Sequence, residues 1–395
     1  MNTRLAIILI TIAAAIGEKA LAQDPTNIVS ATPSRTVSVS QLAQEPGHLI
    51  KDFNQRGLSF QGLFINDWSE ELRGTDPDGF GRYSLDLSLN LDANKALGWK
   101  GSSAYVRLKQ HINEFGEMYP DAVQIPSNID SASRTTLYEL WAQQVLFSEK
   151  LRLKVGKIDA NTEFDQVQGA ADFLNSSMGY SPTIMAFPSY PEPKLAAAAF
   201  YSVRRSDQIG VGVFRTAGNG ILSVVEPGHS WSLPKNDLPG HVNVGYWRLD
   251  GSIARFDGSQ SSMTQGVYTV LEQTVWRQTL TGKDSQRVLS TFFQFGHSDG
   301  VVSDLTAHLG AGLVMQAPLT VRPHDAVGLA YTGVQFSPYG NASEKRQNES
   351  TIESYYKLTI SSKISFVQDF QLIHRPGGSA KTDCPIITPR VVIAF

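Results

Sequence analysis

The sequence has a single cysteine, Cys384, among its 395 residues, and it has no large excess of either charge. One cysteine excludes an intramolecular disulfide framework, so the fold must be stabilised by its own packing. With 34 basic and 37 acidic residues, the formal net charge of -3 gives no field that would attract nucleic acid. Beyond the N-terminal region no apolar stretch is long enough for a helix to cross a membrane. A soluble secreted protein or a membrane β-barrel is left.

The first residues indicate export. A positive start, Met1–Arg4, precedes the apolar run Leu5–Ile16 and a small-residue cleavage site at Ala20–Ala22, so residues 1–22 are predicted to be a cleaved signal peptide. Residues 23–41 are rich in Ser, Thr and Pro and are expected to be a flexible leader. Partial helical spacing over residues 42–57 predicts a short amphipathic helix that Gly57 ends.

From Leu58 onward the apolar residues recur with a period of two. In Ser84–Leu91 all four leucines share one face, while Asp86, Ser88 and Asn90 share the other. This alternation predicts strands at 58–66, 82–92, 103–112, 136–147, 150–158, 194–203, 208–215, 241–250, 266–276, 286–296, 304–314, 325–336, 351–361, 364–374 and 386–395. Bacterial single-chain barrels have an even strand number, and residues 221–225 offer a sixteenth strand. The strand lengths suit a tilted membrane-spanning strand.

The connections have two sizes, as short periplasmic turns and longer outer loops require. Tight turns are predicted at 147–150 and 361–364, and long loops at 113–135, 159–193 and 216–240. Residues 159–193 are the predicted constriction, because the segment is long and partly apolar. It either folds back into the barrel or lies over its rim.

Aromatic residues near strand ends are expected to form girdles at the lipid headgroups or, alternatively, to be core aromatics of a β-sandwich. They are Trp68, Trp99, Tyr138, Trp247, Trp276 and Phe395. The final segment, Ile386–Phe395, ends on an aromatic residue in strand register, which resembles the signal by which outer-membrane barrels are recognised for assembly. We therefore predict an all-β transmembrane antiparallel barrel of about 16 strands over residues 58–395.

If the apolar face of each strand meets lipid, the opposite face lines a channel. That face carries charged residues of both signs: Asp86, Arg107, Lys109, Glu139, Arg152, Lys154, Glu353 and Lys357. Trp141, in register with Glu139, could offer a ring for a sugar to stack on. Weak, repeated contacts suit passage, because tight binding would block flux. The alternative is that these charges only pair with one another and keep the lumen wet.

Several short strings, in their shared order, resemble the carbohydrate-selective porin family (OprB type) of Gram-negative outer membranes over roughly residues 50–395. They are 137–144 (LYELWAQQ), 151–160 (LRLKVGKIDA), 173–179 (FLNSSMG), 188–191 (PSYP), 266–273 (GVYTVLEQ), 322–325 (RPHD) and 371–378 (QLIHRPGG). The family's usual Trp-Gly-Gly signature before the helix is missing, and residues 46–53 stand there instead.

The resemblance implies a single barrel of about 16 strands, a periplasmic N-terminal helix, and passive uptake of glucose-like sugars and related small solutes. It also supports Arg322, Asp325 and Arg375, near strand ends, as further pore or mouth residues. The expected partners are sugars and small hydrophilic solutes, outer-membrane lipid, and the barrel-assembly machinery through the strand that ends in Phe395. No nucleic acid or cofactor is expected, and the barrel works alone or as a homo-oligomer.

Catalytic and metal-binding patterns are weak. Gly296–Gly300 matches the G-x-S-x-G pattern, but a strand rather than a helix is predicted to follow, so a hairpin turn is favoured. Asp76–Gly79 lacks the later glutamate of a calcium loop and is predicted to be a turn. The leading hypothesis is a sugar porin of a Gram-negative outer membrane, not an enzyme. The alternatives are a general small-solute porin, a barrel enzyme and a soluble carbohydrate-binding β-sandwich.

Overall fold

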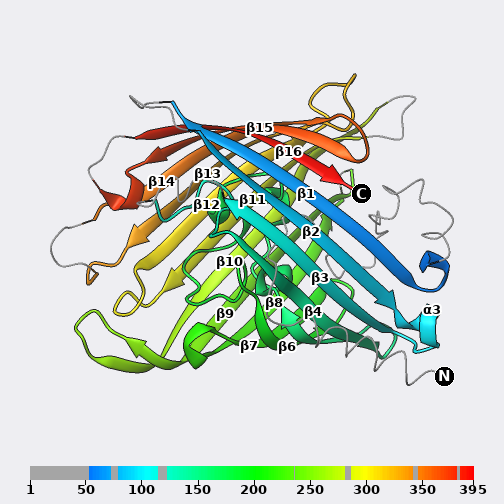
Figure 1. Ribbon diagram of the computed structural model, residues 1–395, viewed down its shortest axis with the longest axis horizontal. Helices are drawn as coiled ribbons and strands as arrows, with labels where there is room; N and C mark the ends of the chain where they lie inside the picture. Colours follow the sequence, from blue (N-terminus) through cyan, green and yellow to red (C-terminus); the bar gives the residue numbers. More distant parts are fainter. Residues whose placement is uncertain are drawn as a thin grey trace.

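The chain forms a closed barrel of sixteen antiparallel strands, in which each strand pairs with its neighbours in sequence and β1 pairs with β16 (Figure 1). The computed structural model describes residues 53–72, 79–113, 122–234, 236–280, 286–340, 346–379 and 383–395. The strands are β1 (Leu58–Glu71), β2 (Phe80–Asp92), β3 (Ser102–Asn113), β4 (Arg134–Leu146), β5 (Leu151–Ile158), β6 (Lys194–Ser202), β7 (Asp207–Arg215), β8 (Ile221–Leu233), β9 (Leu238–Ala254), β10 (Gln260–Thr279), β11 (Gln286–Ser298), β12 (Leu305–Gln316), β13 (Ala326–Phe336), β14 (Glu349–Thr359), β15 (Ile364–His374) and β16 (Cys384–Ala394). The closed barrel overturns the β-sandwich alternative.

Each predicted strand corresponds to an observed one, and the sixteenth, suggested at 221–225, is the start of β8. The long loop predicted at 216–240 is wrong, because β8 and the first residues of β9 occupy most of it. The loop was predicted there partly because Pro227–Gly228 is a pair of residues typical of turns. In the barrel these residues lie within β8, opposite Ile209 and Gln208 of β7.

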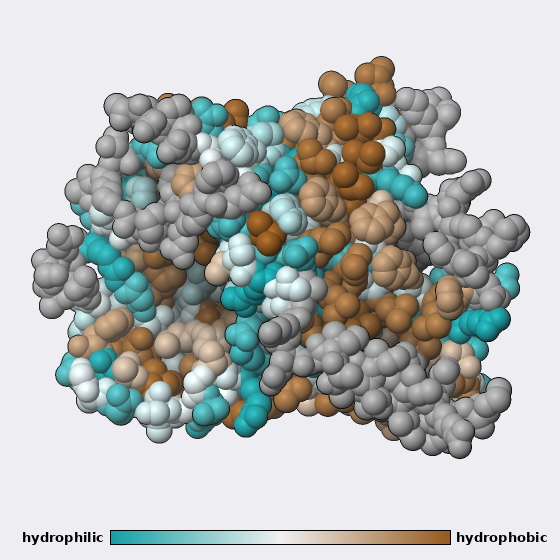
Figure 2. All heavy atoms as spheres, viewed as in Figure 1, coloured by the Kyte–Doolittle hydropathy of each residue, from teal (hydrophilic) through white to brown (hydrophobic). Residues whose placement is uncertain are grey.

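The two-residue period separates an inner from an outer face. On β2 the side chains of Ser84, Asp86 and Ser88 are buried inside the barrel. Outward residues of other strands, such as Val155 and Leu195, are exposed apolar side chains. Figure 2 shows such apolar residues gathered over the strands, mainly in the half of this face nearer the C terminus. No helix among the described residues is long and apolar enough to cross a membrane.

The two ends of the barrel differ in their connections. One end, called here the turn end, carries the tight turns at 147–150 and 360–363 and the short helix α3 (Ala93–Leu97), which Asp92 caps and Gly98 ends with a φ of 75°. The opposite end, called the loop end, carries the long connections 114–133 and 159–193. The C terminus lies toward the turn end, where Phe395 pairs with Gly62 of β1 (Figure 1).

The barrel closes at the C terminus. The Phe395 amide donates to the Gly62 carbonyl at 2.9 Å, and the Gly62 amide donates to the Phe395 carbonyl at 2.7 Å. A Cβ on Gly62 would lie 2.2 Å from Cε2 of the Phe395 ring, so the ring covers a position that must be glycine.

The expected aromatic girdle is wrong for two residues. Trp68, Trp99, Trp276 and Phe395 are exposed, but Tyr138 and Trp247 are fully buried inside the barrel. Trp247 alternates in step with Leu249, which also faces inward. Tyr138 is opposite a register shift between Arg107 and Leu108, and this bulge turns the tyrosine inward beside Glu139.

The predicted N-terminal segments 1–22 and 23–41 lie outside the described residues, as does most of the helix predicted at 42–57. Of that helix, residues 53–55 are described and are helical. Gly57 follows them with a φ of 81°. Of the predicted turn at 76–79, only Gly79 is described.

Candidate functional site: the barrel interior

The connection between β5 and β6, residues 159–193, folds into the barrel. Phe164 stacks on Phe200 of β6 with ring centroids 5.3 Å apart and meets Phe214 of β7 edge-on. Gln294 of β11 donates to the carbonyls of Ser177 and Met178 at 2.9 and 3.1 Å. Of the two arrangements that the sequence left open, the structure therefore has the inward one. This segment is called the inner loop below.

Hydrogen bonds at the first residue of the inner loop direct it inward. The Asp159 carboxylate accepts from the Asn161 amide at 3.0 Å and from the Ser189 hydroxyl at 2.6 Å, which joins the two ends of the loop. It also accepts from the buried Tyr138 hydroxyl of β4. The start of the inner loop, directly after β5, is thus held against the wall of the barrel.

The connection between β3 and β4 also packs inside, within its described residues 122–133. Arg390 of β16 donates to both Asp67 oxygens, at 2.7 and 2.8 Å, and to Asn128 at 2.9 Å. Glu349 of β14 accepts from the amides of Val123 and Gln124. The described residues of this connection are therefore held against β1, β14 and β16 inside the barrel.

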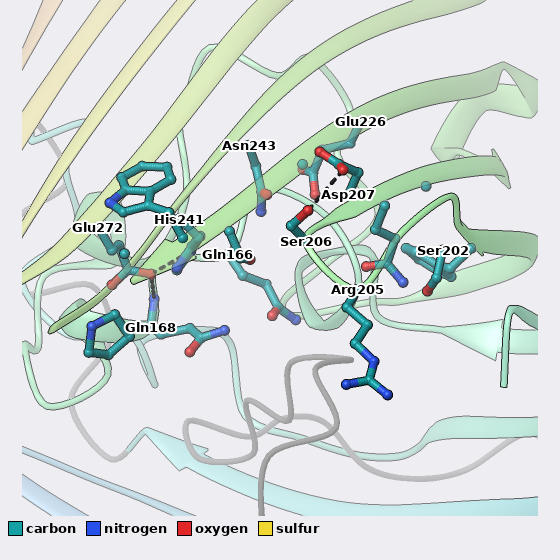
Figure 3. A pocket seen from close by; sticks show the side chains of 18 of the residues that line it. Gln166, Gln168, Ser202, Arg205, Ser206, Asp207, Glu226, His241, Asn243 and Glu272 are labelled. Atoms are coloured by element: carbon teal, nitrogen blue, oxygen red, sulfur yellow. Dashed lines mark hydrogen bonds and ion pairs between the residues drawn. The ribbon is translucent and has the colours of Figure 1, made fainter. Parts of the chain in front are cut away.

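Toward the turn end the interior holds two cavities. One, of about 810 Å³, lies between β1–β3 on one side and the inner loop with β14 on the other. It is lined by Asp86, Ser88, Tyr105, Arg107, Gln168, Ala171 and Lys357, among others. The other, of about 760 Å³, lies against β6–β11 and is shown in Figure 3. Gln168 borders both cavities, so this residue of the inner loop lies between them.

The charged residues predicted on β2–β5 all lie inside and form ion pairs. Lys109 Nζ is 2.7 Å from Asp86, and Arg107 is 3.5 Å from Glu139. Arg152 and Lys154 share Glu163 of the inner loop, at 2.7 and 2.6 Å. The interior here is polar but nearly neutral in sum. That these residues border a solute path stays a prediction.

Glu163 keeps its charge because of this arrangement. Burial raises the pKa of the Glu163 carboxyl, but the charges of Lys154 and Arg152 and their hydrogen bonds outweigh it and lower the pKa. An ionised Glu163 therefore holds two strand cations and ties the inner loop to β5.

The ring of Trp141 packs against two other inward side chains. Trp141 shares the inner face with Glu139; Tyr105 stacks on it with ring centroids 5.0 Å apart, and Lys154 Nζ lies 3.9 Å from the ring centre. Both rings of the stack are half-buried, and Tyr105 is the one that lines the larger cavity. That Trp141 contacts a solute stays a prediction.

Four further predicted residues, Glu353, Lys357, Arg322 and Asp325, contact or lie in the segments that connect the strands, and Lys357 also lines the larger cavity. Glu353 accepts from the inner-loop amide of Asn175, and Lys357 lies 2.6 Å from Asp172. Arg322 and Asp325 pair at 2.8 Å within the connection of β12 to β13, at the turn end. Asp325 also accepts from the Tyr356 hydroxyl at 2.7 Å, which braces this connection.

Sequence reasoning missed Tyr105, Glu163, Gln168 and Glu272. Tyr105 could have been found, because it alternates with Arg107 and Lys109 on one strand face. Glu272 likewise alternates with the buried residues Tyr268 and Val270 of β10. Glu163 and Gln168 lie in the inner loop, which has no periodicity from which a facing direction could be inferred.

The described residues hold no group of three or more His, Cys, Asp or Glu that could bind a metal. The serine of the G-x-S-x-G match, Ser298, ends β11 and donates to the Leu305 carbonyl at 2.5 Å. The next strand, β12, follows directly, so the predicted hairpin turn is confirmed and the strand-turn-helix setting of a nucleophile is not found there.

A closed sixteen-strand barrel with an apolar exterior, a polar interior and a loop folded into its lumen defines the porin class of proteins. The family described as carbohydrate-selective porin, OprB family, matches residues 81–395. The chain therefore belongs to the carbohydrate-selective porin family. No curated protein sequence matches it.

Solved structures of low sequence identity share the fold. Pseudomonas putida OprB in its high-pH structure superposes with a TM-score of 0.79 at 19% identity, covering 88% of this chain and 97% of that one. Its low-pH structure gives a TM-score of 0.60 at 18% identity, with 88% and 96% covered. A loop-deletion mutant of Vibrio cholerae OmpT gives 0.53 at 9% identity, with 86% and 99% covered.

Proposed function

We propose that the protein is an outer-membrane porin through which neutral, glucose-like sugars diffuse passively. The observation that carries the proposal is the larger cavity, in which Tyr105 offers an aromatic ring among hydrogen-bonding groups. Ser88 and Gln168 supply uncharged donors and acceptors, and Asp86 and Arg107 supply charged ones that are already paired. Sugar hydroxyls exchange water for such groups, and the C–H faces of a sugar ring pack on an aromatic ring.

The balance of charge supports a neutral solute. Along β2–β5 the cations Arg107 and Lys109 each have a carboxylate of their own, while Arg152 and Lys154 share one, so four cations face three carboxylates. A path with an excess of only one charge attracts neither anions nor cations strongly, whereas the dipoles of the paired groups still hydrogen-bond a polar solute. Contacts of this kind are weak and repeated, which passage requires.

The same proposal covers location and assembly. The exposed apolar side chains of the strands suit contact with lipid in a Gram-negative outer membrane, which the predicted signal peptide of residues 1–22 would let the chain reach. The strand that ends in Phe395 would be the segment read by the barrel-assembly machinery. The barrel is expected to work without a cofactor.

The test is the conductance of the purified protein in a planar bilayer, with glucose, other sugars and small organic acids titrated in. Stepwise channels that millimolar sugar partly blocks, and that organic acids do not, are the expected result. Steps that no sugar changes would indicate a general small-solute porin instead. Folded protein that produces no steps would contradict the channel itself.

A further inference from the structure

One segment of the inner loop, Gln168–Asn175, is held at both ends by glutamates of the barrel wall. At its start Glu272 of β10 accepts from the amides of Gln168 and Gly169, with one oxygen each, at 3.0 and 2.5 Å (Figure 3). At its end Glu353 of β14 accepts from the amides of Leu174 and Asn175. Both carboxylates thus bind the backbone of the loop, and of the segment's residues Gln168 and Ala171 line the larger cavity.

The two glutamates lie in one row of paired residues across the sheet. Glu272 pairs with Phe292, which pairs with Gly312, then Ala330, and finally Glu353. Four strand spacings of about 4.8 Å separate them, roughly 19 Å in all. The segment between them is coiled rather than extended: it begins as the 3-10 helix η3 (Gln168–Ala170) and continues in a turn, in which the Phe173 amide donates to the Ala170 carbonyl at 3.1 Å.

Small residues in the wall make room for the middle of the segment. Phe173 meets Phe292 and Tyr355 edge-on, with ring centroids 5.8 and 4.8 Å away. A Cβ on Gly328 would lie 2.7 Å from the Phe173 ring, and Gly312 and Ala330 are also small. The fully buried Phe173 therefore fixes the middle of the segment at one position along the barrel axis.

The opposite edge of the segment forms one wall of the larger cavity. Gln168 and Ala171 line that cavity across from Tyr105, and Asp172 is held by Lys357. The two glutamates hold the backbone of the segment against β10 and β14. The width of the larger cavity, from the segment to β1–β3, therefore depends on these hydrogen bonds.

We propose that Glu272 and Glu353 form a two-point clamp that sets the width of the sugar path, with Gln168 as a specificity-determining residue and Glu272 as its positioning residue. This inference rests on the proposed function. Glu272 acts as a carboxylate with two acceptor oxygens, and His241 Nε2, 3.1 Å away, adjoins one of them. Glutamine at this position has the same shape but only one acceptor oxygen, so one loop amide would face an NH₂ group.

Two variants test the clamp by different physical routes. Glu272→Gln removes one of the two acceptors and is expected to loosen Gln168, which gives a noisier open channel and weaker discrimination between a monosaccharide and a trisaccharide. Gly169→Ala places a Cβ 2.9 Å from Glu272 Oε1 and 3.3 Å from Phe292 Cδ1, so the Glu272 carboxylate and the segment must move apart, and we expect the segment to shift toward the path. Its expected result is a lower conductance and a fall of roughly twofold or more in trisaccharide relative to monosaccharide permeation.

Matched controls exist in the same chain. Glu149→Gln removes one negative charge at the exposed β4–β5 turn, far from the clamp in sequence and contacts. Gly179→Ala adds a methyl group within the inner loop where no atom lies within 4 Å. Both controls are expected to conduct and discriminate like the unchanged protein. Heat-modifiable gel migration establishes that each variant is folded.

The outcomes separate the two proposals. If folded Glu272→Gln and Gly169→Ala both keep the unchanged protein's conductance, noise and sugar ratio, the clamp is overturned. If the unchanged protein conducts without discriminating sugars, yet the two variants alter its conductance and the controls do not, the clamp holds and the sugar-porin proposal fails.

Discussion

Two walls of the barrel use the same residue types in different ways. On β2–β5, the inward carboxylates of Asp86 and Glu139 pair with lysine and arginine of a neighbouring strand, and Glu139 also accepts the Asp159 amide at the start of the inner loop. On β8–β14, inward carboxylates such as Glu226, Glu272 and Glu353 accept backbone amides of the inner loop. The first wall keeps paired charges near the larger cavity and holds the loop through the cations of β5 that bind Glu163, whereas the second wall holds the loop backbone with its own carboxylates. An inward carboxylate is therefore part of the lumen lining, an anchor or, as Glu139 shows, both, and its partners decide which.

The largest expected effect breaks the anchoring wall. Glu353→Ala leaves the buried amides of Leu174 and Asn175 without their acceptor, and orphaned buried groups cost about 1–3 kcal/mol each. We expect the free energy of unfolding to fall by about 3 kcal/mol, measured by urea titration of the heat-modifiable form in detergent. Equal stability of Glu353→Ala and the unchanged protein would show that the anchoring role is wrong.

The next effect concerns the lining wall. Tyr105→Leu removes the aromatic ring that borders the larger cavity, and it is expected to weaken sugar block of the channel by roughly twofold to twelvefold, since such ring contacts contribute about 0.5–1.5 kcal/mol. Tyr105→Phe keeps the ring and loses only the hydroxyl that accepts from Arg107, so it should retain most of the block. Identical loss in both variants would indicate that the hydroxyl, rather than the ring, contacts the sugar.

A smaller effect sharpens the contrast in charge. Arg152→Gln removes one of the two cations that share Glu163, leaving Lys154 with the carboxylate. The cation-to-anion permeability ratio is expected to rise by roughly twofold, as read from the reversal potential in a salt gradient. Arg152→Lys retains the charge and serves as the control. No change in reversal potential for Arg152→Gln would mean that ions do not pass close to this residue.

The smallest effect lies outside both walls, at the turn end. Burial raises the pKa of Asp325, but hydrogen bonds from Arg322, Tyr356 and the Thr359 amide outweigh it and lower the pKa to about 2. Because the folded-state pKa is below that of the unfolded chain, this carboxylate stabilises the fold above the unfolded pKa of about 3.9 and loses its effect as the pH falls through about 2.

Asp325→Asn should therefore unfold at a lower temperature than the unchanged protein at neutral pH, with the gap closing between about pH 4 and about pH 2. Thermal unfolding followed by circular dichroism across that range measures the gap. A gap that stays constant down to the lowest pH would show that the charge of Asp325 contributes nothing and that only its shape matters.

Much of the barrel could be predicted from the sequence because a strand's two faces repeat every two residues. The leucines of β2 identified its outer face, and the same reasoning put Arg107 and Lys109 inside. The period misled at two kinds of site. A bulge turned Tyr138 inward because its extra residue breaks the two-residue alternation at that point, and Pro227–Gly228 hid β8 because this pair of residues is typical of a turn.

The site was less predictable. Trp141 was expected to offer its ring to a solute; in the structure the ring packs against Tyr105 and Lys154, which come from other strands. Glu353 and Lys357 were expected to line the lumen; both bind the inner loop, and Lys357 also lines the larger cavity. Which inward residue meets a loop depends on the loop's path, and a loop without periodicity carries no record of that path in its sequence.

The sequence by itself determined that the chain is an all-β barrel, where fifteen of its sixteen strands lie and which way most of their side chains face, because local alternation sets these properties residue by residue. Only the tertiary structure decided that residues 159–193 enter the lumen and that Glu272 and Glu353 stand in one row to hold them. Those arrangements depend on strand register summed around the barrel, which joins residues about 80 positions apart through four successive pairings.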